Sequence, residues 1–353
     1  MSVQFREFVK KIGSGKHTGK DLTRAEAQQA MQMLLEQNAT PAQVGAFLIA
    51  HRIKRPTAEE LAGMLDAWEQ FSYCLPPLSQ PSPLVVLGSP YDGRARNSPI
   101  SLVTGLILAV AGFPVLLHGS DRLPTKYGLP LMDIWQKLAV PWQKISPDQV
   151  HGVLQDSNLG FAYMPHFCPA FHALVPYREE IGKRPPLATL ELIWSPYKGR
   201  QIVLSGFVHP PTEAVMIETF ALRGIDHYAT LKGLEGSVDL PITRVSVIGR
   251  HLPETGWQRI TLNARNYGLE GNDPNLTTAE AIAQAITETL DGKISDYSKS
   301  AVWNGAIALW LCCKCADIEA GISTVQAYLR QGLVAEKLGQ VRQTVGHLIS
   351  QID

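Results

Sequence analysis

Residues 84–117 read LVVLGSPYDGRARNSPISLVTGLILAVAGFPVLL, and this stretch decides the fold. Leu84–Leu87 is a short apolar run typical of a buried strand, and a glycine-containing loop, Gly88–Asn97, follows it. Residues 100–111 form an apolar helical segment, and a second apolar strand, Phe113–Leu117, comes next. A strand, a helix and a strand in this order predict a βαβ unit and therefore a parallel sheet.

Predicted strands and helices continue toward the C-terminus. Further strands are predicted at Ile202–Ser205, His227–Leu231 and Val245–Ile248. Helices are predicted at 130–139, 166–181, 210–223, 278–290, 298–315 and 320–345. Residues 84–353 are therefore predicted to form a larger α/β domain with a central, mostly parallel sheet.

The residues before this region predict a small N-terminal helical domain over 1–75. Thr23 with Glu26, and Thr57 with Glu60, have the spacing of a capping box, and apolar residues recur at helical spacing after each pair. Thr40-Pro41 predicts the start of a helix between them. A proline-rich linker, residues 75–83, then separates the two domains.

Composition excludes several classes of protein. The 353 residues are 45% hydrophobic and 18% charged, which argues against disorder. Lys plus Arg and Asp plus Glu are both 32, so bulk charge does not favour nucleic-acid binding, although a local basic face stays possible. There is no apolar run of membrane-spanning length and no signal-peptide core, and five cysteines do not suggest a disulfide framework. We expect a cytoplasmic protein that makes no contact with a membrane.

The loop after the first strand is a candidate anion site. In a parallel sheet, ligands bind beyond the carboxyl ends of the strands, and arginine can hold a phosphate through two parallel hydrogen bonds. The candidate phosphate or substrate ligands in this loop and at the following helix start are Gly88, Ser89, Asp92, Gly93, Arg94, Arg96 and Ser101. The alternative is a structural βα turn in which the glycines only satisfy backbone geometry.

Two other segments hold residues that are candidates for binding an anion or a nucleic-acid backbone. His118-Gly119 follows the second strand, with Arg122 just beyond, and these residues are candidates for the same site, although His118 can equally be a buried core histidine. Residues 1–24 hold six basic against two acidic side chains. Lys10, Lys11, Lys16 and Lys20 there, with Arg94 and Arg96, are candidates for contact with a nucleic-acid backbone. The alternative is a solvated helix face and loop.

The chain resembles the anthranilate phosphoribosyltransferase family. The resemblance rests on the run from Leu22 to Ala67, on the strand and glycine loop at 84–97, and on Phe161–Arg184 and Asn304-Gly305-Ala306. It implies a transferase of the phosphoribosyl or glycosyl class with a helical domain, an α/β domain and a cleft between them. It also implies a homodimer formed through the helical domain, with part of 165–190 packed on that domain. The family's activity belongs to tryptophan biosynthesis.

The chain departs from the family pattern at residues that bind ligands in the family. The family's Gly-Thr-Gly-Gly-Asp loop, which binds phosphoribosyl diphosphate, is replaced by Gly88–Gly93, where Pro90 has no N–H. The Asp-Glu pair that holds magnesium in the family aligns with Val238-Asp239, so Asp239 is a weak candidate for binding Mg²⁺. Arg178 falls where the family uses an arginine for the carboxylate of anthranilate.

Two functions follow from the resemblance. In the first, the chain keeps a glycosyl-transferase site for a phosphorylated sugar or nucleotide, with little or no activity on anthranilate. In the second, it is a non-catalytic homodimer that binds nucleic acid on the same scaffold, as has been associated with a diverged branch of the family. We rank the transferase hypothesis ahead, because the cleft architecture that the resemblance implies is kept, and the nucleic-acid hypothesis stays open as the alternative.

Overall fold

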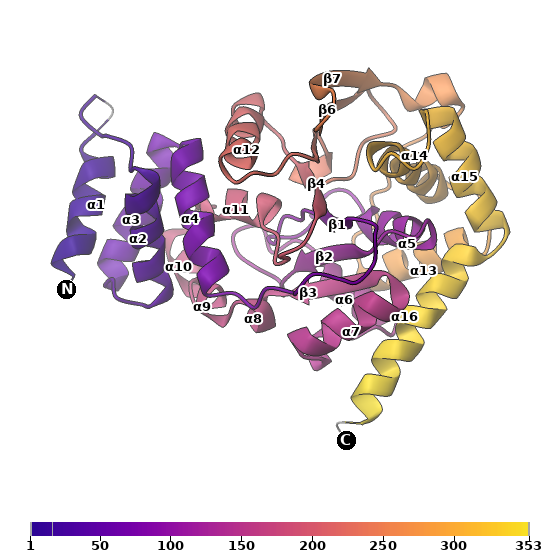
Figure 1. Cartoon of the computed structure of the whole chain (residues 1–353), viewed down its shortest axis with the longest axis horizontal. Coiled ribbons are helices and arrows are strands. Elements are labelled where there is room, and N and C mark those ends of the chain that lie inside the picture. The colour runs from indigo at the N-terminus through magenta and orange to yellow at the C-terminus, as the bar shows by residue number, and fades with distance from the viewer. Residues whose placement is uncertain (1, 16, 352–353) are drawn as a thin grey trace.

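The structure is a computed structural model that describes residues 2–15 and 17–351. Its N-terminal part is a bundle of helices, α1 (Val3–Gly13), α2 (Arg24–Leu35), α3 (Pro41–Lys54) and α4 (Ala58–Gln70), which lies to one side of the sheet (Figure 1). Capping boxes at Thr23, Thr40 and Thr57 begin α2, α3 and α4. The predicted helical domain is therefore present.

Helix α1 lies in the region predicted to be helical, but its start was not among those identified from the sequence. The Ser2 hydroxyl accepts a hydrogen bond from the Phe5 N–H and caps the helix start. Phe5, Phe8 and Ile12 lie on one face and are buried. Phe5 packs against Phe47 of α3 with ring centroids 5.3 Å apart, so tertiary packing fixes this helix.

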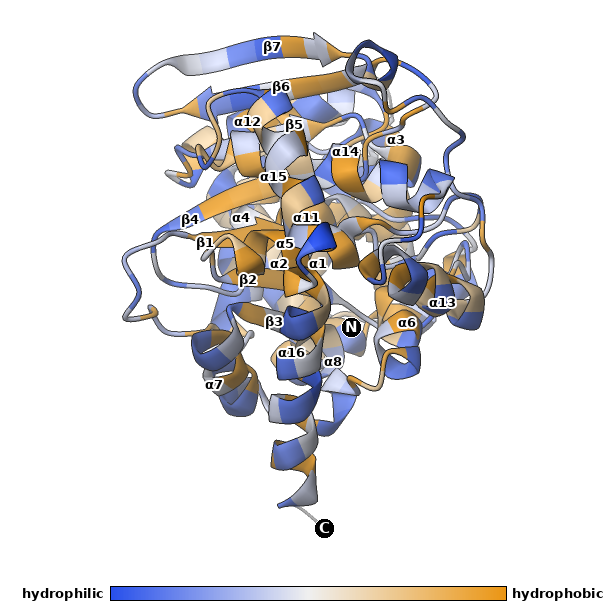
Figure 2. Ribbon diagram, turned by 90° about the vertical axis from the view of Figure 1, so that its right-hand side faces the viewer, coloured by the Kyte–Doolittle hydropathy of each residue, from blue (hydrophilic) through white to orange (hydrophobic). Residues whose placement is uncertain are grey.

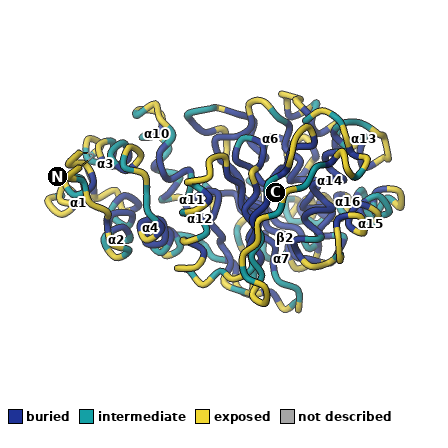
Figure 3. Tube along the Cα trace, turned by 90° about the horizontal axis from the view of Figure 1, so that it is seen from above, coloured by how far each residue is buried: buried dark blue, intermediate teal, exposed yellow. Residues whose placement is uncertain are grey.

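A seven-stranded sheet forms the centre of the larger part, in the order β3-β2-β1-β4-β5-β6-β7. Its strands are β1 (Leu84–Leu87), β2 (Val115–Gly119), β3 (Leu159–Tyr163), β4 (Gln201–Gly206), β5 (Tyr228–Leu231), β6 (Ser246–Leu252) and β7 (Gly256–Leu262). The strands from β3 to β5 are parallel, and β6 and β7 pair antiparallel at one edge. The predicted mostly parallel sheet is confirmed. Strand β1 is hydrophobic throughout, whereas β2 ends in His118-Gly119 (Figure 2). Both strands are buried along their whole length, as Figure 3 shows for β2.

Helices cover the sheet. These are α5 (Ser101–Val110), α6 (Leu131–Lys137), α7 (Pro147–Ser157), α12 (Pro210–Leu222), α13 (Ala279–Leu290) and α14 (Asp296–Leu311). Single 3₁₀ turns lie at Trp142–Lys144, Leu234–Gly236 and Ala264–Tyr267. Helix α5 of the βαβ unit packs between the sheet and α14. In residues 2–15 and 17–351, no helix combines the length and apolar character needed to cross a bilayer.

Two predicted helices are wrong as single elements. The segment 166–181 forms three short helices, α8 (Met164–Phe167), α9 (Pro169–His172) and α10 (Val175–Ile181), because Pro169 and Pro176 lack the N–H that a continuous helix needs. The segment 320–345 is split into α15 (Ile318–Arg330) and α16 (Leu333–Ser350). Gly332 has φ +73°, a left-handed conformation that ends one helix and starts the next.

Stacked aromatic rings join the helical bundle to the sheet-containing part. Trp68 of α4 stacks on Phe171 of α9, with centroids 3.7 Å apart, and on Trp194, with centroids 4.8 Å apart. Trp194 follows α11 (Leu187–Ile193), and the Tyr73 N–H donates to the Phe167 carbonyl at 2.7 Å. Helix α10 also contacts α3. Segment 164–194 therefore connects the two parts.

Candidate functional site

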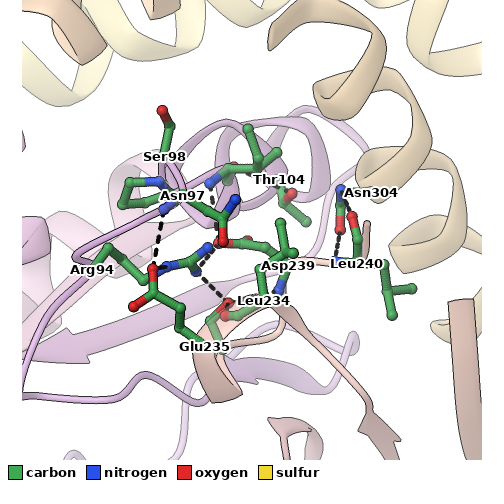
Figure 4. Close-up of polar contacts among 12 residues, drawn as sticks. Arg94, Asn97, Ser98, Thr104, Leu234, Glu235, Asp239, Leu240 and Asn304 are labelled. Carbon is green, nitrogen blue, oxygen red and sulfur yellow. Dashed lines mark hydrogen bonds and ion pairs between the residues drawn. The ribbon is translucent and has the colours of Figure 1, made fainter. Parts of the chain in front are cut away.

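The candidate site lies beyond the carboxyl ends of the parallel strands, where two loops meet. One loop, Gly88–Ile100, leaves β1, and the other, Lys232–Leu240, leaves β5 (Figure 4). The second loop is fixed from behind by Asn304 of α14, whose side-chain oxygen accepts from the Leu240 N–H at 2.7 Å and whose amide donates to the Leu240 carbonyl at 3.1 Å. The two loops contact each other mostly through charged side chains and backbone N–H groups.

Arg94 points inward and binds the chain's own carboxylates. Its Nη1 donates to Asp239 Oδ2 at 2.7 Å and also to the Ser237 hydroxyl, and its Nε lies 3.6 Å from Glu235 Oε1. Only 4% of the side chain is exposed. The loop arginine that sequence reasoning assigned to a bound anion therefore already has anionic partners within the protein.

The Glu235 carboxylate accepts hydrogen bonds from the backbone of the β1 loop. One carboxylate oxygen, Oε1, accepts hydrogen bonds from the N–H groups of Ala95, Arg96 and Asn97 at 3.2, 2.9 and 3.1 Å. Lys126 Nζ lies 3.2 Å from the other oxygen, Oε2. Burial alone would raise the pKa of Glu235, but the backbone N–H groups and the charges of Arg94 and Lys126 outweigh it and lower that pKa to about 2. The carboxylate is thus a tightly held anion.

The residues around Asp239 do not fit a magnesium ion. Asp239 Oδ2 already accepts from Arg94 and from the Ile100 N–H at 3.1 Å, and the neighbouring residue is Val238 rather than a second acid. A guanidinium at 2.7 Å supplies the positive charge and repels another cation. Mg²⁺ needs a near-octahedral set of oxygen donors. Among residues 2–15 and 17–351, no group of three His, Cys, Asp or Glu side chains is placed to hold a metal ion.

Four of the predicted ligands line one small cavity. Ser89, Gly93, Arg94 and Ser101 lie around it together with Ser237. Its volume is about 10 Å³, which is room for about one water molecule. The predicted anion pocket of the β1 loop is therefore brought together by the fold, but it is too small for a phosphate.

The other loop residues have local roles. Gly88 packs so closely on the next segment that a Cβ would lie 2.2 Å from the Leu192 carbonyl oxygen. Arg96 is exposed, and Asp92 is buried with its Oδ1 3.4 Å from Arg184 Nη2. Both Asp92 oxygens lack a hydrogen-bond partner within the described residues.

His118 lies among aromatic side chains and not in a cleft. It is fully buried, its Nδ1 lies 2.8 Å from the Tyr91 hydroxyl, and its ring packs edge-on against Trp194. Burial lowers the pKa of His118 to about 3, so the ring is neutral at pH 7. Gly119 is buried at the end of β2, and Arg122 lies at the surface, 3.2 Å from Asp133.

Arg178 is held by an internal carboxylate. It is 1% exposed, and its Nη1 donates to Glu191 Oε1. Glu191 Oε2 accepts from the Tyr91 N–H at 3.2 Å, which ties α10, α11 and the β1 loop together. Burial raises the pKa of Glu191, and the charges of Arg178 and Arg184 oppose that rise.

The candidates for nucleic-acid contact are not gathered on one surface. Lys10 pairs with Glu7 at 2.9 Å and Lys11 with Glu26 at 2.6 Å, while Lys20 follows α1 without a paired acid among the described residues. Lys16 lies outside the described residues. Arg94 is buried inside the protein, so the N-terminal segment and this arginine do not form one basic face.

A cleft lies between the helical bundle and the sheet-containing part, as the resemblance implied, but sequence reasoning did not identify the basic residues of the bundle that line it. Its volume is about 670 Å³, and it is lined from the bundle by Arg52 and Arg55 and from the other part by Arg184 and His209. Within the described part of the chain, its lining contains no aspartate or glutamate. The basic residues of the run His51–Arg55 were visible in the sequence. Only the fold brings this run to the same cleft as Arg184.

Comparisons with known proteins agree with this architecture. Residues 6–71 match the model of the glycosyl transferase family, helical bundle domain, and residues 92–335 match the glycosyl transferase family, a/b domain. The chain is 29% identical to the anthranilate phosphoribosyltransferase of Anaeromyxobacter dehalogenans strain 2CP-C, over 92% of this chain and 94% of that protein. It is 27% identical to an uncharacterized protein of Aquifex aeolicus, over 92% of this chain and 99% of that protein.

A solved structure supports the fold. Anthranilate phosphoribosyltransferase from Saccharomyces cerevisiae, solved in complex with PRPP and Mg, superposes with a TM-score of 0.85 at 17% identity. The match covers 98% of this chain and 99% of that one. The family resemblance and the fold class predicted from the sequence are both confirmed.

Proposed function

The chain belongs to the glycosyl transferase family defined by a helical bundle domain and an a/b domain, and from this premise we propose that it is a non-catalytic protein that binds nucleic acid in the cleft lined by Arg52, Arg55, Arg184 and His209. The observation that carries the proposal is that exposed Arg52 and Arg55 line this cleft and that, in the described residues, its lining holds no acidic side chain, while the charge of Arg184 is paired with Asp92 outside the lining. Phosphates are the ligands that arginine side chains bind best.

The absence of transferase activity is part of the proposal. Relatives of this chain are anthranilate phosphoribosyltransferases, and one was solved with PRPP and Mg. Here Arg94 lies against Asp239, the carboxylate that aligns with the family's metal ligands, and Glu191 lies against Arg178. These internal ion pairs support a site that does not take the metal and the acceptor of the relatives.

The cleft is accessible in the way that a nucleic-acid backbone requires. Arg52, Arg55 and His209 are exposed, and Arg184 is half-buried. Exposed Ile53 and Val208 lie among these charges and offer apolar contact to sugars or bases. The resemblance implies a homodimer formed through the helical domain. The cleft would then occur twice in the assembly. Sedimentation equilibrium tests whether the dimer forms.

Fluorescence anisotropy with a labelled random oligonucleotide at 50 mM salt tests the proposal. We expect binding by the wild type and a loss of about tenfold or more in affinity for the double variant Arg52→Ala/Arg55→Ala. The matched control Arg330→Ala removes an exposed arginine at the end of α15 and should leave affinity unchanged. Titration of a mononucleotide and of PRPP with Mg²⁺ in the same cell distinguishes a nucleic acid from a small phosphorylated ligand.

Two results would overturn binding in the cleft, and a third would change the ligand. One is no binding of the oligonucleotide at 50 mM salt. The other is binding that the double variant and Arg330→Ala reduce equally, because the cleft would then have no special part in it. A mononucleotide that binds as tightly as the oligonucleotide would replace nucleic acid by a small phosphorylated ligand.

A further inference from the structure

We propose that Lys54 is a positioning residue of the basic cleft between the helical bundle and the sheet-containing part. It holds the backbone of Arg55 in the conformation that places this arginine in the lining of the cleft, where it binds a phosphate. The inference rests on the proposed function, because it assigns Arg55 a phosphate of a nucleic acid as its ligand. Lys54 is not part of the cleft lining, so it acts on binding through Arg55.

Arg55 has a backbone conformation that an arginine seldom adopts. Its φ is +69° and its ψ is 132°, and it directly follows the last residue of α3. A residue other than glycine rarely takes a positive φ, and such a conformation persists only where other contacts compensate for its cost. Pro56 favours the extended ψ of the residue before it but does not require a positive φ. The positive φ of Arg55 therefore needs another cause.

Two hydrogen bonds fix the peptide groups on either side of Arg55. Its N–H donates to the His51 carbonyl at 3.0 Å, which closes the last turn of α3. Its carbonyl accepts from Lys54 Nζ at 3.1 Å. The first bond is of the kind found at many helix ends, whereas the second exists only because the Lys54 side chain folds back toward its own backbone. Lys54 is therefore the side chain that holds Arg55 in this conformation.

Lys54 is held in turn by the buried carboxylate of Glu60. Lys54 Nζ donates to Glu60 Oε2 at 2.8 Å and also to the Asp21 carboxylate, and only 13% of the lysine side chain is exposed. Glu60 Oε2 also accepts from the Thr57 N–H at 2.8 Å, and Oε1 accepts from the Leu22 N–H at 2.9 Å. Hydrogen bonds to a charged group are among the stronger ones in proteins. This carboxylate therefore gives Lys54 a fixed anchor.

The conformation of Arg55 decides where its side chain lies. A rotation about its N–Cα bond from +69° to the usual negative range would turn the Cα–Cβ bond to another side of the chain. In the observed conformation Arg55 lines the cleft together with Arg52, and both are exposed. The charge of Arg184 is already paired with Asp92. Arg52 and Arg55 are thus the arginines of the lining that can neutralise an external phosphate, and the position of Arg55 sets affinity.

Melting temperatures measured by calorimetry without any ligand test the positioning. Glycine adopts a positive φ at less cost than alanine, so Arg55→Gly should melt higher than Arg55→Ala by about 1 °C or more. In a Lys54→Met background the backbone of residue 55 can relax, and this difference should vanish. The matched control Lys293→Met removes an exposed lysine that pairs with Glu288 at 2.8 Å, and the difference should be kept there. A difference of equal size in all these backgrounds, or none in the wild type, overturns the inference.

Fluorescence anisotropy with the labelled random oligonucleotide, at about 50 mM salt, tests what the position of Arg55 does. Lys54→Met should lose as much affinity as Arg55→Ala, about threefold or more. The two losses should not add in the double variant, because both remove the same contact. The losses of Lys54→Met and Arg52→Ala should add, because these variants remove different contacts. Lys293→Met should bind as the wild type does.

The outcomes separate this inference from the proposed function. If the wild type binds no oligonucleotide, the proposed function fails, and the melting temperatures still decide whether Lys54 positions Arg55. If the wild type binds, full affinity of Lys54→Met overturns the inference. Losses for Lys54→Met and Arg55→Ala that add also overturn it, because Lys54 would then act through its own charge. If Lys54→Met does not fold, Lys54→Gln, which has a shorter and uncharged side chain, takes its place.

Discussion

The carboxylate of Glu191 lies against the guanidinium of Arg178, and both side chains are buried, at the position where the family resemblance implies that the carboxylate of an acceptor would bind. An internal anion therefore neutralises the arginine that the relatives would need for their substrate. Internal pairing of charged groups recurs at Arg94 with Asp239 and at Glu235 with the β1 loop.

Breaking the Arg178–Glu191 pair should destabilise the fold strongly. Glu191→Gln keeps the size of the side chain but leaves the Arg178 charge without its nearest partner, and we expect a loss of about 3 to 5 kcal/mol in the free energy of unfolding. Urea denaturation followed by circular dichroism measures it. The control Glu179→Gln, at an exposed glutamate on the same helix as Arg178, should change stability by less than about 0.5 kcal/mol. Equal effects of the two variants would mean that the pair is not structurally important.

Acid should weaken the fold through Glu235 and Glu60. Burial alone would raise the pKa of Glu60, but His51, Lys54 and the Leu22 N–H outweigh it and lower that pKa to about 2, as found for Glu235. Both values lie below the value of about 4.3 expected in the unfolded chain. Each carboxylate therefore stabilises the fold above that pH, and its contribution is lost as the pH falls toward 2.

The pH effect has a clear measurement. Urea midpoints should fall for the wild type between pH 6 and pH 3. Each carboxylate contributes roughly 3 kcal/mol at pH 6, and about half of this is lost by pH 3, because the pKa in the folded state is about 2. Glu235→Gln should be less stable than the wild type at pH 6 and should lose less on acidification. Parallel pH curves for the two proteins would show that Glu235 does not have a depressed pKa.

The aromatic stack should be a main connection between the helical bundle and the sheet. Trp68→Ala removes a fully buried ring from between Phe171 and Trp194, and we expect a loss of about 3 to 5 kcal/mol in the free energy of unfolding. Trp257→Ala is the control, because Trp257 is 41% exposed on β7 and should cost about 1 kcal/mol or less. Differential scanning calorimetry should show one transition for the wild type, and equal shifts in both variants would contradict this role.

The salt dependence of oligonucleotide binding should report on the cleft arginines individually. The slope of the logarithm of the association constant against the logarithm of salt concentration should become shallower by about 1 for each arginine removed from Arg52 and Arg55. The same slope should be retained in Arg330→Ala. If the cleft variants kept the wild-type slope, these arginines would not contact phosphates.

Much of the fold could be predicted because its signals are local. Capping boxes at Thr23 and Thr57 and the apolar runs around β1 and β2 specify elements through neighbouring residues. Strand β7 carries no such signal, since it is a largely exposed edge strand whose pairing with β6 defines it. The helix predicted over 166–181 is wrong as one element, because Pro169 and Pro176 lack the N–H that a continuous helix needs.

The site could be predicted only as a set of residues. The β1 loop and its arginines were identified, and Ser89, Gly93, Arg94 and Ser101 do meet at one cavity. What the sequence did not contain is the partner of each charge, because Arg94 and Glu235 are separated by more than a hundred residues. The basic cleft was not predicted for the same reason, since Arg55 and Arg184 line one cleft only in the folded chain.

The account depends on the internal side chains having taken the positions of the relatives' ligands. A steady-state assay with anthranilate, phosphoribosyl diphosphate and Mg²⁺, run beside an active member of the family, tests this most directly. We predict no product above the rate without enzyme for this protein, at substrate concentrations that saturate the active relative. Turnover comparable with that of the relative would contradict the account.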